Sequence, residues 1–233
     1  MTARYAIYYI PGRDSALERF GRSWLGWDVW RAEPVPLTPL AGFDAAERSA
    51  LVRTPRQYGF HATLKAPMAL APGMAAEDLL AAARRFATRT APGPALDLKL
   101  ATIGRFLALT PAAPSPALNA LAATCVTVFD EFRKPLQPAD RGRRRPESLT
   151  ARQREYLDRW GYPYVLDEFR FHLTLSGAAA PDVLDRLRDG LAPLLQPVLA
   201  GPSGLDALAV AVQPARDGPF RVLEYLPLSG DQA

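Results

Sequence analysis

The sequence is poor in cysteine and histidine, and it has no long run of apolar residues. Cys125 is the only cysteine among 233 residues, which excludes an intramolecular disulfide and a cysteine-based zinc or iron–sulfur centre. No apolar run approaches the roughly 18 residues that a membrane span needs. The N-terminus passes directly into an apolar strand pattern at 5–10 rather than a secretory signal. These absences predict a cytoplasmic protein without membrane contact, in which Cys125 is a small core residue.

The composition is that of a folded domain with a modest excess of positive charge. Hydrophobic residues make up 48% of the chain and charged residues 22%, which is ordinary for a globular protein. The 23 prolines exceed the usual ~5% about twofold and predict short elements joined by stiff connections. A net charge of +4 favours anionic partners such as phosphate esters or RNA. The length fits one two-lobed domain over residues 1–233.

The order of predicted elements in the first half of the chain returns in the second half. Residues 57–110 give strand, helix, strand, strand, and residues 168–227 give the same order, with the first strands at 57–66 and 168–176. This repetition predicts an α+β fold of two related lobes about a pseudo-twofold axis. A basic segment at about 135–147, which contains the run Arg141–Arg145, is expected to form a surface loop between them.

Further helices are predicted outside the repeated units. Ser15 or Asp14 caps the first, Asp44 caps the second, and Gly161 ends the last. Their expected ranges are about 15–27, 45–55, 116–133 and 150–160.

The two histidines of the chain lie in matching segments. One segment reads YGFHATL at 58–64 and the other reads FRFHLTL at 169–175. Both have an aromatic residue, any residue, Phe, His, a small or apolar residue, Thr and Leu. Each opens one copy of the repeat, and His172 follows His61 by 111 residues. A chance origin would require every histidine of the chain to fall into one local pattern, so the two segments predict a common functional site.

Strand geometry separates a core face from a polar face in both segments. Because successive side chains of a strand point to opposite faces, Phe60, Ala62 and Leu64 are expected in the core. The other face then presents a histidine and, two residues later, a threonine. The two pairs are expected to converge in a central cleft. Candidate substrate-binding residues share this face, and for each of them a solvated or structural role is the alternative: Lys65, Arg170 and Ser176.

The side chains of this predicted site suit phosphodiester hydrolysis without a metal ion. Two imidazoles with pKa values near 6.5 can act as an acid and a base at neutral pH. Threonine hydroxyls can donate hydrogen bonds to phosphoryl oxygens. Two histidines could also bind zinc, but the pattern lacks a third ligand. No cofactor and no metal are therefore expected. Which histidine is the base stays open at this point.

The twin His-x-Thr motifs resemble those of the two-histidine phosphoesterase superfamily, also called LigT-like or cyclic phosphodiesterase-like. The flanking residues RQYGFHATLKAP (56–67) and FRFHLTLSG (169–177) are more similar still to one branch, encoded beside carbon–phosphorus lyase genes for phosphonate use. With RYAIYYIP (4–11), the resemblance covers nearly the whole chain. It implies two antiparallel sheets flanking a central cleft, helices outside, and metal-independent action on cyclic phosphates. It also implies four catalytic residues: His61, Thr63, His172 and Thr174.

The sequence therefore predicts a cyclic phosphodiesterase with a small phosphorylated substrate. The candidates are 5-phosphoribosyl 1,2-cyclic phosphate and a nucleoside 2′,3′-cyclic phosphate. Arg143 and Arg144 are candidates to hold a second phosphate, with a solvated loop as the alternative. RNA is less favoured, because no RNA-binding motif accompanies the charge, and a monomer is expected. The alternative function is an RNA-end or nucleotide-binding protein with the same site but no turnover.

Overall fold

The computed structural model describes residues 3–201 and 203–231. Its strands are β1 (Arg4–Tyr9), β2 (Trp27–Asp28), β3 (Glu33–Pro34), β4 (Ala62–Met68), β5 (Leu98–Ile103), β6 (Phe106–Pro111), β7 (Leu173–Thr174), β8 (Ala207–Gln213) and β9 (Arg221–Pro227). Its α-helices are α1 (Ala16–Leu25), α2 (Ala45–Arg56), α3 (Ala76–Arg89), α4 (Pro116–Val128), α5 (Pro138–Gly142), α6 (Ala151–Trp160) and α7 (Pro181–Leu199). Short 3₁₀ turns are η1 (Phe129–Phe132), η2 (Pro146–Ser148) and η3 (Leu166–Glu168).

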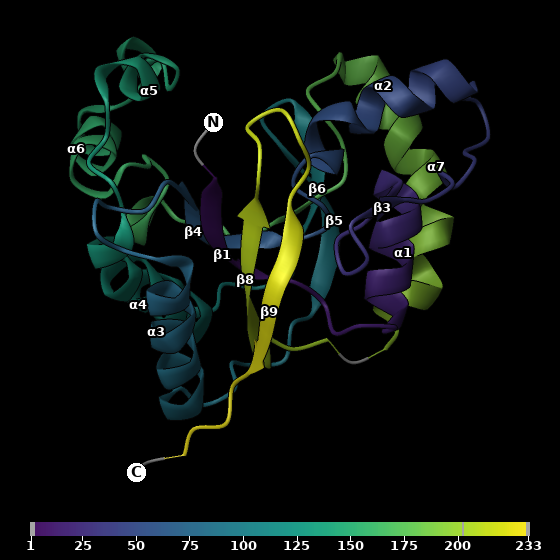
Figure 1. Cartoon of the computed structure of the whole chain (residues 1–233). Coiled ribbons are helices and arrows are strands. Elements are labelled where there is room, and N and C mark those ends of the chain that lie inside the picture. The colour runs from purple at the N-terminus through teal and green to yellow at the C-terminus, as the bar shows by residue number, and fades with distance from the viewer. Residues whose placement is uncertain (1–2, 202, 232–233) are drawn as a thin grey trace.

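Two antiparallel sheets form the centre of the molecule. One has the strand order β4-β1-β8-β9 and the other β5-β6-β7, and the hairpin β2-β3 stands apart. Helices α3, α4, α5 and α6 lie on one side of the strands, and α1, α2 and α7 lie on the other (Figure 1). The predicted α+β class is confirmed. Within 3–201 and 203–231, no helix combines the length and the apolarity that crossing a membrane requires.

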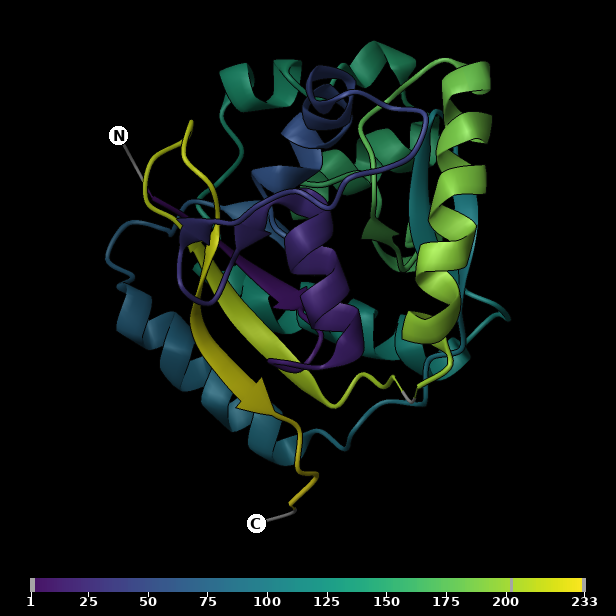
Figure 2. The same ribbon diagram turned by 90° about the vertical axis from the view of Figure 1, so that its right-hand side faces the viewer.

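The strand pairing relates the two halves with boundaries that differ from the predicted ones. β1 pairs antiparallel with β4 and β8, and β6 pairs antiparallel with β7 and β5. The pairing of β4, β1 and β8 thus matches that of β7, β6 and β5, which relates a first unit, residues 4–103, to a second unit, residues 106–213. The last strand of the first unit, β5, lies in the sheet of the second, and the last strand of the second unit, β8, lies in the sheet of the first. Helix α3 packs on β8 and β9, as α7 packs on β5 and β6 (Figure 2). The ranges expected as copies, 57–110 and 168–227, each contain a strand, a helix and two strands in that order.

The strands that follow the histidines are shorter than predicted. β4 begins at Ala62 rather than at 57, and β7 comprises only Leu173 and Thr174. Before β4 the chain turns at Gly59, whose φ of +73° belongs to the left-handed region that glycine adopts without strain. Before β7 the chain forms η3. Each histidine therefore lies one residue ahead of a strand, in an extended segment outside the ladder.

Helix α1 contacts both histidine segments. Its backbone passes so close to the first segment that a Cβ atom on Gly21 would lie 2.0 Å from Cδ1 of Phe60. Trp24, one turn later, is fully buried and donates its indole N–H to the carbonyl oxygen of Leu175 at 2.8 Å. One helix thus holds the residue before His61 and the residue after Thr174.

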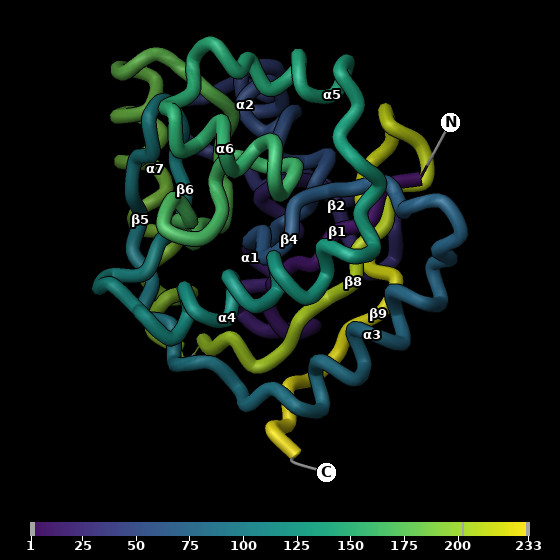
Figure 3. Tube along the Cα trace, turned by 90° about the vertical axis from the view of Figure 1, so that its left-hand side faces the viewer, coloured from purple at the N-terminus to yellow at the C-terminus, as the bar shows by residue number. Residues whose placement is uncertain are grey.

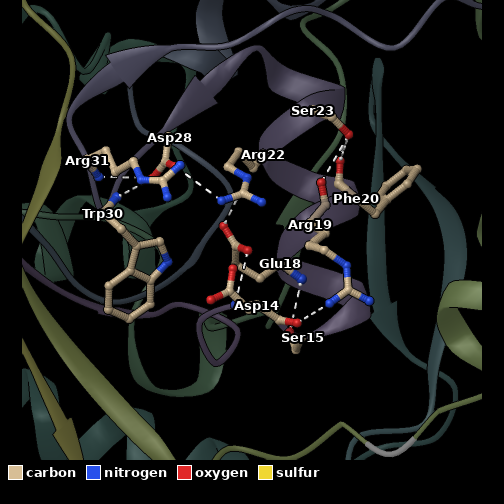
Figure 4. Close-up of polar contacts among 10 residues, drawn as sticks. All are labelled: Asp14, Ser15, Glu18, Arg19, Phe20, Arg22, Ser23, Asp28, Trp30 and Arg31. Atoms are coloured by element: carbon tan, nitrogen blue, oxygen red, sulfur yellow. Dashed lines mark hydrogen bonds and ion pairs between the residues drawn. The ribbon is translucent and has the colours of Figure 1, made fainter.

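A buried polar network anchors the hairpin β2-β3 to α1. Arg22 pairs with Glu18 at 3.7 Å and with Asp28 at 3.2 Å. Asp28 also accepts two backbone N–H groups of the turn that follows it (Figure 4). The hairpin in turn holds the C-terminal strands, since the indole N–H of Trp27 donates to the carbonyl oxygen of Phe220 at 2.8 Å.

The close approach of α1 to the first histidine segment gives a stability prediction. We expect Gly21→Ala to lower the free energy of unfolding by about 1–3 kcal/mol, the usual cost of overpacking a core. The matched control is Gly142→Ala, because a Cβ atom there meets nothing within 4 Å. Urea denaturation measures both. Equal stability of the Gly21→Ala variant and the wild type would contradict the packing described here.

Candidate active site

The two His-x-Thr segments present the faces that their alternation predicts. The apolar residues of both segments are buried in the main core: Phe60, Ala62, Leu64, Phe171, Leu173 and Leu175. The histidine and threonine side chains between them remain partly exposed. In the ladders, Thr63 lies opposite Tyr8 of β1, and Thr174 lies opposite Ala108 of β6. The two polar faces are thus topologically equivalent, but their neighbours differ.

Both imidazoles are held in the same way by their own segments. Nδ1 of His61 lies 2.9 Å from the carbonyl oxygen of Gly59, and Nδ1 of His172 lies 2.7 Å from that of Arg170. A carbonyl oxygen only accepts hydrogen bonds, so Nδ1 must carry the proton in each ring. The neutral imidazoles therefore keep a lone pair on Nε2, the nitrogen that points away from the backbone contact.

The surroundings of the two Nε2 atoms differ. Nε2 of His61 accepts a hydrogen bond from the hydroxyl of Thr63 at 3.2 Å. The ring of Tyr8 packs against the same imidazole, with ring centroids 3.8 Å apart. His172 contacts Phe106, at 5.8 Å between centroids. Both histidines are thus oriented by a backbone carbonyl and an aromatic ring.

Burial and mutual repulsion keep the imidazoles from being charged together. Burial lowers the pKa of His61 to about 4, against the opposing effect of the Gly59 carbonyl, and the charge of His172 lowers it further. Burial also lowers the pKa of His172, again against a carbonyl, that of Arg170. The charge of one ring thus acts on the other. The pair therefore favours one proton at most, and burial disfavours His61 as its holder.

Two of the predicted substrate-binding residues have structural partners. Lys65 is 2% exposed, and its Nζ atom donates to the carbonyl oxygen of Val126 at 2.9 Å and to Asp130 at 2.5 Å. Ser176 is 1% exposed, and its hydroxyl accepts the backbone N–H of Leu107 at 3.0 Å. The structure therefore favours the structural alternative for both residues. No local pattern pointed to Asp130, which lies 65 residues after Lys65.

The predicted arginines lie in three different settings. Arg170 is exposed, and its backbone rather than its side chain contacts His172. Arg143 pairs with Asp140 at 2.6 Å on the surface of α5. Arg144 turns inward, and its guanidinium lies 4.9 Å from the ring centroid of Tyr162. Of these three side chains, Arg144 is the one that lies over an aromatic ring.

Sequence reasoning missed two tyrosines next to His61. Tyr8 packs on its ring, and Tyr58 stacks on it at 6.1 Å between centroids. One signal was present in the sequence, because the motif has Tyr58 where the second copy has Phe169. In the part of the chain that the structure describes, no three His, Cys, Asp or Glu side chains cluster as metal ligands.

Comparison with known proteins places the chain in a family. A family model described as a protein of unknown function, DUF1045, matches residues 63–221. The chain belongs to this family. The match contains the second motif and starts at Thr63 of the first.

Two curated relatives have the same name. One is ribose 1,5-bisphosphate phosphokinase PhnN of Janthinobacterium sp. (strain Marseille), 38% identical over 231 residues, which are 97% of this chain and 51% of that protein. The other is ribose 1,5-bisphosphate phosphokinase PhnN of Laribacter hongkongensis, 35% identical over 236 residues, covering 97% of this chain and 53% of that protein. The chain spans about half the length of these relatives.

Two solved structures illustrate what this DUF1045 chain is similar to. TT0787 of Thermus thermophilus is 18% identical with a TM-score of 0.47, covering 98% of this chain and 100% of that one. LigT of E. coli, complexed with 3′-AMP, is 13% identical with a TM-score of 0.42, covering 98% and 99%. LigT is thus among the solved structures to which this chain is similar.

The electrostatics of the site predict how its histidines titrate. Because burial and the charge of His172 hold the pKa of His61 near 4, its NMR signals should titrate about 2 units below an exposed imidazole. The ring is then neutral at pH 7. As the pH falls below about 6.5, the unfolded chain binds a proton at His61 while the folded chain does not. The contribution of His61 to the free energy of unfolding is therefore lost between about pH 6.5 and pH 4.

Proton-detected NMR of the two imidazoles checks this expectation. His61→Asn assigns the signals, and long-range ¹H–¹⁵N spectra should show Nδ1 as the protonated nitrogen of both rings. Titration of His61 near pH 6.5, or a proton on Nε2, would contradict the site geometry.

Proposed function

We propose that the chain is a phosphoesterase that opens a small cyclic phosphodiester by acid–base catalysis between His61 and His172. The observation that supports this most strongly is the matched pair of imidazoles. Each is held by a carbonyl through Nδ1, which leaves Nε2 unprotonated, and the charge of one lowers the pKa of the other. A pair that shares one proton supplies a base and an acid in the same site.

The pKa of about 4 supports His61 as the base of the pair. Neutral His61 takes a proton from water through Nε2, while protonated His172 donates one to the leaving ester oxygen. The bond from phosphorus to the water oxygen forms as the bond to the ester oxygen breaks. His61 ends protonated and His172 neutral, and exchange with solvent restores the pair. The negative phosphodiester favours the initial proton on His172, because an anion raises the pKa of a nearby imidazole.

The threonine hydroxyls hold the phosphoryl group in this scheme. Thr63 donates to Nε2 of His61 before substrate binds. Turning this O–H toward a non-bridging phosphoryl oxygen frees the lone pair of Nε2 for water. Thr174, on the equivalent face of β7, donates to the other non-bridging oxygen. Such donors stabilise charge that develops in the transition state.

The proposed substrate is 5-phosphoribosyl 1,2-cyclic phosphate. Breaking its bond between phosphorus and O2 leaves the phosphate on O1 and yields ribose 1,5-bisphosphate. The curated relatives, about half of whose length corresponds to this chain, are named as kinases of ribose 1,5-bisphosphate. When this chain produces ribose 1,5-bisphosphate and is joined to a kinase that uses it, one protein contains two successive reactions. The motif resemblance to a branch near carbon–phosphorus lyase genes supports the same substrate.

Phosphorus NMR in the presence of EDTA tests the proposal. The wild type should convert 5-phosphoribosyl 1,2-cyclic phosphate to ribose 1,5-bisphosphate, with one oxygen from ¹⁸O-water in the new monoester. His61→Ala and His172→Ala should each lower the rate by about 10²–10⁴-fold, the usual contribution of a general acid or base.

The controls separate loss of chemistry from loss of fold. Thermal unfolding of both variants should stay close to that of the wild type, and 2′,3′-cyclic AMP serves as a second ring in parallel. Opening of 2′,3′-cyclic AMP alone would overturn the substrate, and a rate that survives both substitutions would overturn the mechanism.

A further inference from the structure

Tyr8 has a buried hydroxyl that nothing in the described structure satisfies. The side chain is 0% exposed, and its oxygen has no hydrogen-bond partner among residues 3–201 and 203–231. Its ring packs on His61 with centroids 3.8 Å apart. Buried polar groups are nearly always hydrogen-bonded, and an exception beside reactive groups calls for a ligand. The hydroxyl of Tyr8 is therefore a donor that the protein itself leaves unused.

Polar and charged groups from distant parts of the chain shift the pKa of this hydroxyl. Burial raises the pKa of Tyr8, the hydroxyls of Tyr58 and Tyr162 raise it further, and the charges of Arg4 and Arg144 lower it. Burial likewise raises the pKa of Tyr162, and Arg144 lowers it. Contacts between these parts support the grouping: Arg4 lies over Phe220, and the ring of Phe220 packs on Tyr8 and Tyr58. Asp140, four residues before Arg144, pairs at 3.0 Å with Arg216, four residues before Phe220. The segment of Arg144 thus contacts the turn that leads to the ring packed on Tyr8.

Arg144 differs from the other arginines of its segment. Arg141 pairs with Asp158 at 2.7 Å, and Arg143 pairs with Asp140 at 2.6 Å, both at the surface. Arg144 is half-buried on the face of Tyr162 and forms no ion pair within the described ranges. The chain reverses directly afterwards at Arg145, where φ is +47°. Figure 3 shows the backbone of this segment from its own side of the molecule. Arg141 and Arg143 are thus paired with carboxylates, whereas the half-buried Arg144 is not.

The same groups are missing from the other half of the site. Where Tyr8 lies opposite Thr63, Ala108 lies opposite Thr174. Where Tyr58 precedes His61 by three residues, Phe169 precedes His172. Acid–base catalysis requires the two imidazoles, which both halves supply. Donors present on one side only therefore serve a part of the substrate that is not symmetric about the reacting phosphorus.

We propose that Tyr8, Tyr58, Tyr162 and Arg144 form an anion subsite beside His61 that takes a second phosphate group of the substrate. The proposal rests on the proposed function and specifies its substrate class: cyclic phosphodiesters that also have a terminal phosphomonoester. The guanidinium supplies charge and paired N–H donors. The tyrosine hydroxyls supply further donors, and the Tyr162 ring keeps Arg144 oriented through its face.

Binding of ribose 5-phosphate tests the subsite without requiring turnover. Calorimetry should show that Tyr8→Phe and Arg144→Met each weaken binding by about tenfold to a hundredfold, the usual range for a hydrogen bond to a charged group. The control for the first is Tyr9→Phe, the neighbour that faces the main core. The control for the second is Arg152→Met, because Arg152 also lies over a tyrosine, Tyr156 at 4.7 Å, but pairs with Glu155. Both controls should bind like the wild type.

Turnover of two substrates then separates this subsite from the reaction centre. The wild type should favour 5-phosphoribosyl 1,2-cyclic phosphate over ribose 1,2-cyclic phosphate in kcat/KM, and Tyr8→Phe and Arg144→Met should remove most of that preference. Equal losses with both substrates would overturn the proposal and place these groups at the reacting phosphorus. Unchanged affinity for ribose 5-phosphate would also overturn it. If the wild type binds ribose 5-phosphate through these residues but opens neither ring, the proposed function fails while the subsite stands.

Discussion

A backbone carbonyl two residues upstream holds each of the two imidazoles by its Nδ1 proton. This contact determines the tautomer, and the tautomer determines that Nε2 faces away from the backbone with a free lone pair. The contact requires the chain to leave the strand at the histidine. On the first side the left-handed turn at Gly59 provides the bend, and on the second side η3 precedes a two-residue strand. The shortness of β4 and β7 relative to the predicted strands is thus part of how the site is built.

The rest of the fold brings the two held imidazoles together in a buried setting. β4 and β7 are edge strands of different sheets, and each sheet contains the last strand of the opposite unit. Helix α1 reaches both segments through Gly21 and Trp24. Burial lowers the pKa of both rings, and the charge of His172 lowers that of His61 further. The low pKa of His61 therefore arises from its packing rather than from a difference between the two motifs.

The parts of the site that follow from local alternation were predictable from the sequence. Phe60, Ala62 and Leu64 face the core, and His61 and Thr63 do not, because strand periodicity fixes both. What depends on distant partners was not predictable. Asp130 forms an ion pair with Lys65, although the two residues lie 65 positions apart in the sequence. In the sequence, Tyr8 belongs to an apolar pattern that is typical of a buried strand. Only the pairing of Tyr8 with Thr63 in the sheet shows that it lies next to the predicted site. The strand pairing that relates residues 4–103 to residues 106–213 was not predictable for the same reason, since strand exchange between sheets has no sequence signal.

A crystal structure with ribose 5-phosphate and orthovanadate tests the central claim most directly, because vanadate adopts the five-coordinate geometry of an in-line displacement. The account predicts vanadium between the two motifs, with one apical oxygen at hydrogen-bond distance from Nε2 of His61 and the other from Nε2 of His172. Vanadate bound to one histidine alone, or to an imidazole turned to present Nδ1, would contradict it.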